Sequence, residues 1–273
     1  MWFDREVSDR AHRPGPRPGR TALLLGLATV LLAAGVTTIA VRGSESEPVQ
    51  AAPVATTTSS TTTTTEAPPP TAVPPSTALA TPNGEVTTYD EPGGSEVGTV
   101  GFWYGYPMTM PIVEDQGEWL RIMMPERPNM STAWVRADDV TRSSSSFRIV
   151  IRLAETKLTV YQDGFELFSA PVGIGTAATP TAPGSFFVAV IEKPGPPGYG
   201  PLVLDTNGHS EAIQSWEGSG DAITAIHGPI SASSDARIGT TGTRISNGCI
   251  RMHEADLVKL DVIPLGTPVD IIA

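Results

Sequence analysis

Cysteine is nearly absent from this chain of 273 residues, in which Cys249 is the only one. One thiol cannot form an intrachain disulfide, so the fold does not depend on a disulfide framework. One cysteine and four scattered histidines give no ligand cluster of the kind that holds zinc, and we expect neither a metal nor a cofactor. A lone cysteine is either a small buried hydrophobic residue or a reactive thiol, and its sequence neighbours decide between the two.

Positive charge is also scarce. Lys and Arg number 18 against 29 Asp and Glu, which gives a formal net charge of −11. Nucleic acids and anionic lipid surfaces bind basic proteins, so neither is expected as the main partner. The N-terminal residues 1–20 are an exception with a net charge of +2, because three acidic residues there face five arginines: Arg5, Arg10, Arg13, Arg17 and Arg20.

Charge is absent from residues 21–41, which are mostly apolar. At 1.5 Å per residue, a helix of this length spans roughly 30 Å, the thickness of a bilayer core. The preceding arginines indicate that 1–20 is a cytoplasmic N-terminus and that everything after Arg42 faces outward. We therefore predict a single-pass signal-anchor helix at 21–41 in the cell membrane, with extracytoplasmic domains in the cell wall or periplasm. A cleaved signal peptide, cut near Ala51, is the alternative.

Residues 42–80 lack side chains that could fill a core. Threonine and serine occupy 56–65, and prolines recur at 68–70. Such a composition cannot bury enough apolar surface to fold, so we predict a disordered Thr/Pro-rich stalk. At about 3.1 Å per residue, its fully extended reach is on the order of 100 Å.

Short apolar runs between turn residues characterise 81–142. Turn clusters such as 90–94 separate the runs, which predicts a small β-barrel. The barrel resembles bacterial SH3-like domains in the order of three segments: 97–100, 117–122 and 133–135. In such a barrel, Trp119 and Trp134 are expected to lie in the core.

After a short polar hinge at 143–146, a second β-rich module occupies 147–273. Alternating apolar and polar residues predict several strands, and an amphipathic pattern predicts one helix at 253–260. The strands are expected at 148–153, 157–161, 165–173, 185–191 and 265–272. The fold class is therefore mainly β with little helix.

Cys249 lies in the segment Ser246-Asn247-Gly248-Cys249-Ile250-Arg251, and His227 precedes it by 22 positions. The thiolate is the nucleophilic form, and a free thiol ionises only near pH ~8.5, so Cys249 needs help at neutral pH. His227 can take its proton or pair with it as an imidazolium. The turn around Gly248 can aim backbone N–H groups at one point, as an oxyanion hole does. Arg251 adds positive potential or docks a substrate carboxylate.

In this order the residues resemble the YkuD-type L,D-transpeptidase catalytic domain, a β-rich sandwich. The resemblance covers 147–273 and rests on two motifs, Ile226-His227-Gly228 and the segment around Cys249. It implies a catalytic group of Cys249, His227, Ser246 and Arg251, and an oxyanion and binding group of Asn247, Gly248 and Gly228. The Gly228 carbonyl is expected to orient the imidazole. Asn247 departs from the pattern, since many members carry a second histidine there.

The resemblance also implies an activity. The protein is expected to form 3–3 peptidoglycan cross-links through a Cys249 thioester, with His227 as general base and acid, in cell wall biogenesis. Its partners are donor and acceptor stem peptides, and carbapenems are expected to acylate the same sulfur. An L,D-carboxypeptidase that uses water as acceptor, or a non-catalytic wall-binding protein, are the alternatives.

The remaining polar and aromatic residues have no expected role in catalysis. His209 is expected in a surface turn and His253 on the exposed side of the predicted helix. Trp216 is expected to pack in a core, and Asp256 to pair with Arg251.

Overall fold

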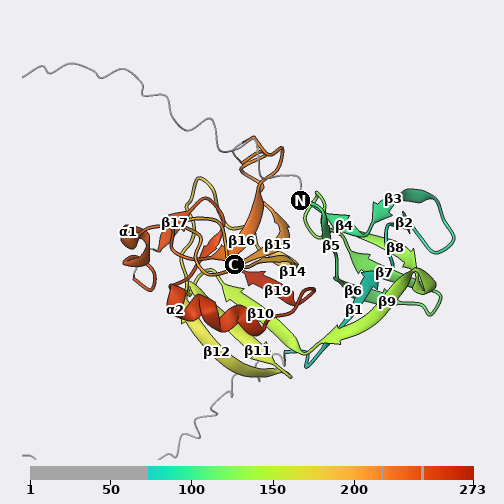
Figure 1. Ribbon diagram of the computed structural model, residues 1–273, viewed down its shortest axis with the longest axis horizontal. Helices are drawn as coiled ribbons and strands as arrows, with labels where there is room; N and C mark the ends of the chain where they lie inside the picture. Colours follow the sequence, from blue (N-terminus) through green and yellow to red (C-terminus); the bar gives the residue numbers. More distant parts are fainter. Residues whose placement is uncertain (1–72, 217, 241–242) are drawn as a thin grey trace, which may run out of the picture. The chain divides into compact units, whose positions relative to one another are not determined.

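The structure is a computed structural model, and it describes residues 73–216, 218–240 and 243–273. These residues belong to one compact unit, Thr65–Ala273. They form two β-rich modules, the N-terminal module (77–145) and the C-terminal module (147–272), as Figure 1 shows.

The predicted cytoplasmic segment 1–20 and the predicted anchor helix 21–41 lie outside the described residues. So does the stalk up to residue 72. In the part of the chain that the structure describes, no helix is long and apolar enough to cross a bilayer.

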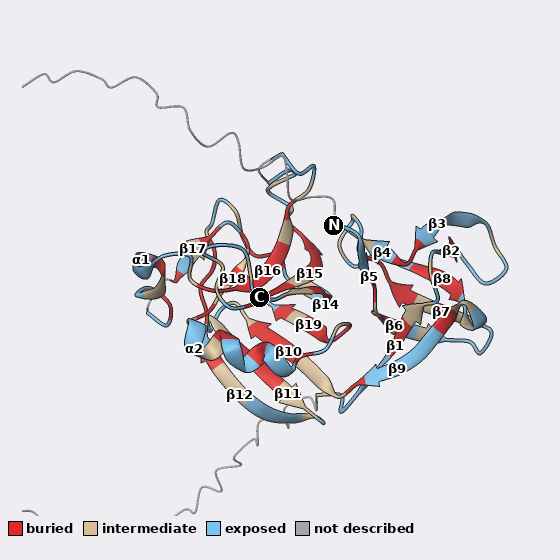
Figure 2. Ribbon diagram, viewed as in Figure 1, coloured by how far each residue is buried: buried red, intermediate tan, exposed pale blue. Residues whose placement is uncertain are grey.

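The N-terminal module is an antiparallel sheet with the strand order β3-β2-β8-β7-β6-β1-β9. Its strands are β1 (Thr77–Pro82), β2 (Val86–Tyr89), β3 (Glu96–Val100), β6 (Met110–Asp115), β7 (Trp119–Met123), β8 (Thr132–Arg136) and β9 (Val140–Ser145). A short hairpin of β4 (Phe102–Trp103) and β5 (Tyr106–Pro107) and a 3-10 turn η1 (Ala137–Asp139) complete it. Side chains that include Met110, Leu120 and Ile122 are buried in its core. Figure 2 shows the buried stretches of its ribbon in red.

Both predicted boundaries of this module need correction. β1 begins at Thr77, so the end of the predicted stalk is part of the sheet. The predicted hinge at 143–146 is also mostly strand, because β9 continues to Ser145 and pairs with β1 from Val140 to Ser145. Backbone hydrogen bonds hold this pair together, and they do not require apolar side chains. For this reason the polar composition of 143–146 led to the wrong prediction of a hinge.

The tryptophans differ in burial. Trp134 is buried, as predicted for the core. Trp119 is half-buried, with its ring against Tyr89 and beneath the guanidinium of Arg136, 4.6 Å from the ring centroid. Trp216 is 41% exposed, so the prediction that it packs in a core is wrong. It lies in the loop between two strands of the C-terminal module, residues 203–209 and 223–227.

The C-terminal module is built on a mixed sheet with the order β12-β11-β10-β19-β14-β15-β16-β18. Its strands are β10 (Phe147–Arg152), β11 (Lys157–Gln162), β12 (Phe165–Pro171), β14 (Gly184–Glu192), β15 (Val203–His209), β16 (Ile223–His227), β18 (Ile250–Arg251) and β19 (Pro268–Ile272). β13 (Ile174–Gly175) and β17 (Arg244–Ser246) form a separate parallel pair. The helices are short: α1 (Ala232–Asp235), α2 (Glu254–Leu257) and the 3-10 helix η2 (Val258–Val262).

The predicted mainly-β fold with little helix is confirmed. The predicted helix at 253–260 corresponds to α2 and η2. β14 carries a continuous apolar run at residues 186–191, and its two faces explain this run. Phe186 and Val188 enter the core of the C-terminal module, whereas Phe187 and Ala189 enter that of the N-terminal module. Because successive strand residues point to opposite faces, both faces of β14 are buried.

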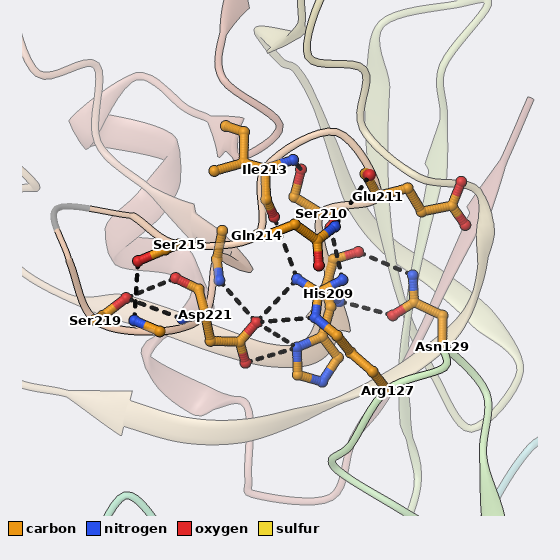
Figure 3. Close-up of polar contacts among 12 residues, drawn as sticks. Arg127, Asn129, His209, Ser210, Glu211, Ile213, Gln214, Ser215, Ser219 and Asp221 are labelled. Carbon is orange, nitrogen blue, oxygen red and sulfur yellow. Dashed lines mark hydrogen bonds and ion pairs between the residues drawn. The ribbon is translucent and has the colours of Figure 1, made fainter.

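A polar network joins the two modules next to β15 (Figure 3). Arg127 pairs with Asp221 at 2.9 Å and donates a hydrogen bond to the Ser210 carbonyl at 2.8 Å. Asn129 bonds the backbone of His209 on both sides, through its amide nitrogen and its amide oxygen.

The network corrects the prediction that His209 lies in a surface turn. His209 is the last residue of β15 and is 2% exposed. Its Nδ1 lies 2.8 Å from an Asp221 oxygen, and its Nε2 lies 3.2 Å from the Pro125 carbonyl. The partners come from outside the local sequence, so the Asn207-Gly208-His209-Ser210 stretch looked like an isolated turn.

Candidate active site

Three neighbouring strands, β15, β16 and β18, bring the predicted residues to one edge of the C-terminal sheet. One row of opposed residues across these strands is buried in the core: Leu204, Ile226 and Ile250. Side chains alternate between faces, so the adjacent residues point to the other face. There, Asp205 lies opposite Ala225, and the same register places Cys249 beside Ala225. His227 and Arg251 are opposite each other on that second face.

Cys249 is a free, half-buried cysteine. Its Sγ lies 3.9 Å from the carbonyl oxygen of Ile223 in β16. Burial raises the pKa of the thiol, and the negative charge of Asp205 adds to this, while the backbone of Ala225 and the charge of Arg251 act in the opposite direction. Because the raising effects prevail, the thiol carries its proton at neutral pH.

His227 ends β16 and is 1% exposed. Its Nδ1 lies 2.7 Å from the Gly228 carbonyl oxygen, the contact that the sequence resemblance implied. A carbonyl only accepts hydrogen bonds, so Nδ1 carries the proton and the neutral ring leaves Nε2 with a lone pair. Burial lowers the pKa of the imidazole to about 4. The Tyr199 ring covers it, with the ring centroids 4.6 Å apart.

These protonation states decide between the two roles that the sequence left open for His227. A neutral imidazole with a lone pair on Nε2 has the form that a general base requires. A preformed imidazolium would need a histidine pKa above neutrality, and burial moves it in the opposite direction. Both pKa shifts therefore favour a neutral thiol and a neutral imidazole at neutral pH.

The backbone next to His227 explains why a glycine follows it. The Gly228 N–H donates to the Tyr199 carbonyl at 2.7 Å. A Cβ at this position would lie 2.9 Å from the same carbonyl oxygen, closer than real Cβ atoms come. Gly228 therefore allows the loop carrying Tyr199 to approach the imidazole closely.

Ser246 holds the turn that carries Cys249. It is buried, and its Oγ donates to the Cys249 carbonyl at 2.6 Å and accepts from the Gly248 N–H at 3.1 Å. Gly248 has φ +122°, a backbone conformation that residues with a Cβ rarely adopt. The Gly248 N–H is therefore engaged inside the turn. Asn247 itself is exposed.

Thr181 supports the same turn from another segment. It is buried, and its Oγ1 donates to the Gly248 carbonyl at 2.8 Å and accepts from the Gly175 N–H at 2.9 Å. Thr181 thereby connects Gly175 to the cysteine segment, which is far away along the chain.

Arg251 is tied to helix α1 rather than to Asp256. Its Nη1 donates to Ser234 Oγ at 2.6 Å. Asp256 instead pairs with Lys259 at 2.7 Å, so the predicted Arg251–Asp256 pair is wrong. A carboxylate on a helix meets the residue three positions later on the same helix more readily than one on a strand end.

A cavity of about 650 Å³ includes Pro229, the residue that follows Gly228 in the sequence, in its wall. Its wall consists of Gly198, Asp235 and the residues at 229–232 and 253–255. His253 contributes to this wall and bonds Asp235 at 2.6 Å, so it is half-buried rather than exposed as predicted. Within the described residues, no group of three or more His, Cys, Asp or Glu could hold a metal ion.

Asp205 is the site residue that sequence reasoning missed. Its pKa is raised to about 7, first by burial and then by the negative charge of Glu192. The available signal was an acidic residue directly after the apolar run Leu202-Val203-Leu204. Its significance depends on β16, which places it on the same face as Cys249.

Residues 146–271 match the family model YkuD, described as the L,D-transpeptidase catalytic domain. The match spans the C-terminal module, including Cys249 and His227. It confirms the predicted L,D-transpeptidase-family catalytic domain in this part of the chain. No curated protein matches the sequence.

Several solved structures are similar to this chain. One is an L,D-transpeptidase from Mycobacterium smegmatis, with 18% identity over 59% of this chain and 80% of that one and a TM-score of 0.38. The catalytic domain of an E. faecium L,D-transpeptidase shares 23% identity over 46% of this chain and 95% of its own, with a TM-score of 0.33. The L,D-transpeptidase LdtMt1 in complex with imipenem shares 16% identity over 72% and 82%, with a TM-score of 0.36.

Proposed function

We propose that this protein is a peptidoglycan L,D-transpeptidase that forms 3–3 cross-links through a thioester on Cys249. The observation that carries the proposal is the state of His227. Its Nδ1–H is held by the Gly228 carbonyl, so an unprotonated Nε2 is present on the same face of the sheet as Cys249. The family-model match over this module supports the substrate class.

In the acylation step, Cys249 Sγ attacks the carbonyl of the third residue, a diamino acid, in a donor stem tetrapeptide. The thiol proton moves to Nε2 of His227. The C–N bond to the terminal D-Ala then breaks, and His227 returns the proton to the leaving amine. A base with a pKa of about 4 gives its proton up readily, which suits this second transfer.

The tetrahedral intermediate carries a negative oxygen that needs hydrogen-bond donors. In this turn the Gly248 N–H already bonds Ser246, so the proposed donors are the N–H groups of Asn247 and Cys249. Arg251 adds positive potential from the neighbouring position on β18. Ser246 acts through the turn that it holds, so we assign it a positioning role.

The thioester is then attacked by the side-chain amine of an acceptor stem, which completes the cross-link. Attack by water instead would make the protein an L,D-carboxypeptidase. The cavity lined by Pro229 is proposed to receive the donor stem, because Pro229 follows the His227-Gly228 pair along the chain and the cavity is large enough for several residues of peptide.

Carbapenem acylation of Cys249 belongs to the same proposal. A strained lactam carbonyl presents the same target to the sulfur as the donor peptide. Imipenem is bound to one of the structurally similar L,D-transpeptidases.

The proposal extends to the N-terminal part of the chain. We assign 21–41 to a membrane anchor, the following segment to a stalk, and the N-terminal module to an SH3-like wall-binding domain. The uncharged run at 21–41 with arginines before it supports an extracytoplasmic location for both modules.

The test uses the full chain, purified in detergent, with a disaccharide-tetrapeptide as substrate and mass spectrometry of the products. A cross-linked dimer that has lost one D-Ala is the expected product, and Cys249→Ala is expected to abolish it. Tripeptide alone from the wild type would identify a carboxypeptidase. Full activity in Cys249→Ala would refute the thioester mechanism, and untouched substrate would favour a non-catalytic wall-binding protein.

A further inference from the structure

We infer that Asp205 is a further catalytic residue: its carboxylate binds the ammonium group of the acceptor stem and takes its proton. It would thereby direct the thioester toward an amine rather than toward water. This inference rests on the proposed transpeptidase function and names the group that selects the acceptor.

The strand register places Asp205 correctly for this role. Asp205 is opposite Ala225, and Ala225 lies beside Cys249, so the three side chains form one row across β15, β16 and β18. The row faces away from the core, because Leu204 and Ile226, the adjacent residues, are buried in it. Between the carboxylate and the sulfur, Ala225 contributes only a methyl group.

The distance across this row suits an attacking amine. Neighbouring strands lie about 4.8 Å apart, so the backbones of Asp205 and Cys249 are separated by about 10 Å. An amine nitrogen about 2.8 Å from a carboxylate oxygen and about 3–3.5 Å from a carbonyl carbon spans much of that gap. The side chains and the acyl group occupy the rest.

Asp205 also lacks a structural partner. No hydrogen bond or ion pair to its carboxylate is formed by any residue in the described ranges, although it is half-buried. The titratable groups that interact with it are Glu192 on β14, Cys249, and Tyr104 in the turn between β4 and β5, and none is a cation. A buried carboxylate without a counter-charge is unfavourable, and it disfavours the Cys249 thiolate as well. A cationic substrate group would satisfy it.

The proposed step balances in atoms and charge. The ammonium gives one proton to the Asp205 carboxylate and becomes a neutral amine. The amine nitrogen bonds to the thioester carbon while the C–S bond breaks, and the sulfur leaves as a thiolate. The thiolate takes the second proton from the nitrogen by way of His227, and Asp205 releases its proton to solvent. With a pKa of about 7, Asp205 can both accept and release this proton near neutral pH.

The experiment separates acylation from acceptor choice. The donor is a disaccharide-tetrapeptide whose side-chain amine is acetylated, so that it cannot serve as acceptor. The acceptor is an isotope-labelled tripeptide with a free amine. D-Ala release measures acylation, and the ratio of cross-linked to hydrolysed donor measures the choice of acceptor. The full chain in detergent is compared with Asp205→Asn, Asp205→Glu and the control Glu192→Gln.

In Asp205→Asn, we expect D-Ala release within about twofold of wild type and a ratio at least about tenfold lower, the usual effect of losing a hydrogen bond to a charged group. Asp205→Glu, which keeps the charge, should recover part of the ratio, and Glu192→Gln should retain it. A carbapenem adduct on Cys249 shows that each variant is folded. Should the Asn variant not fold, Asp205→Ser removes the charge with a smaller side chain.

An unchanged ratio in the variants that lack the carboxylate would overturn the inference. A parallel loss of D-Ala release and cross-linking would also overturn it, because Asp205 would then act on the donor or on the nucleophile. If the wild type releases no D-Ala, the proposed function itself fails, and the inference fails with it. If the wild type releases D-Ala and the ratio does not depend on Asp205, only the inference fails.

Discussion

Replacing Asp205 with Asn should stabilise this protein at alkaline pH, although it removes a group from the site. Burial and the charge of Glu192 raise the pKa of Asp205 from 3.8 to about 7. The native state therefore keeps the proton at pH values where the unfolded chain has already lost it. Its favourable contribution is complete below pH 3.8 and is lost as the pH rises through 7.

The size of the effect follows from this difference. At about 1.4 kcal/mol per pKa unit, ionising Asp205 lowers the free energy of unfolding by about 2–3 kcal/mol between pH 5 and pH 8. His227 changes stability in the opposite direction, because its native pKa of about 4 lies below the ordinary value of 6.5. Its contribution is present above pH 6.5 and is lost as the pH falls toward 4.

Comparing wild type with Asp205→Asn isolates the carboxylate, since His227 is common to both. Urea unfolding followed by tryptophan fluorescence at pH 5 and pH 8 gives the two free energies. The variant should match wild type only below pH 3.8, where Asp205 is protonated in both the folded and the unfolded chain. From pH 5 to pH 8, its stability advantage over wild type should grow by about 2–3 kcal/mol. Glu192→Gln should show a smaller gain, because it removes only the second cause.

A stability difference that is the same at pH 5 and pH 8 would refute this reasoning. It would mean that Asp205 ionises in the folded protein as it does in the unfolded chain. A variant less stable than wild type at pH 8 would show that the carboxylate has a favourable partner in the fold.

Three further outcomes follow from the site. The rate constant for carbapenem acylation of Cys249 should fall only as the pH approaches 4, because His227 stays neutral above it, and a fall centred near pH 6.5 would contradict this. Ser246→Ala removes both hydrogen bonds that hold the turn, so acylation should slow about tenfold or more. The rate of carbapenem adduct formation measures this. An unchanged rate would show that the turn keeps its shape without these hydrogen bonds. Arg127→Ala should lower the free energy of unfolding, measured in urea, by about 1–3 kcal/mol, because the partners of Arg127 lose their hydrogen bonds. Acylation should be retained. Unchanged stability would show that the network does not stabilise the fold.

Local patterns predicted much of the fold. Alternation of apolar and polar residues indicated the strands at 148–153 and 157–161, where β10 and β11 lie. The pattern failed where backbone pairing, rather than side-chain burial, defines the strand. β9 is the example, because its serines pair with β1 while most of them remain exposed.

Burial of single polar residues could not be predicted in the same way. His209 looked like part of a surface turn, yet Asn129, Asp221 and the Pro125 carbonyl surround it. Trp216 is the opposite case, a large aromatic side chain that stays 41% exposed. For His209, the deciding neighbours are brought by the fold from other segments.

The amino-acid sequence determined which side chains are candidates for the proposed chemistry. Ser246, Gly248 and Cys249 are neighbours in the chain, so the turn they form is a local property. The histidine that precedes them and its glycine were also visible as a short motif. The tertiary structure alone decided the protonation of His227 and Cys249 and the place of Asp205. These depend on desolvation and on charges carried by separate strands, and neither exists until β15, β16 and β18 lie side by side.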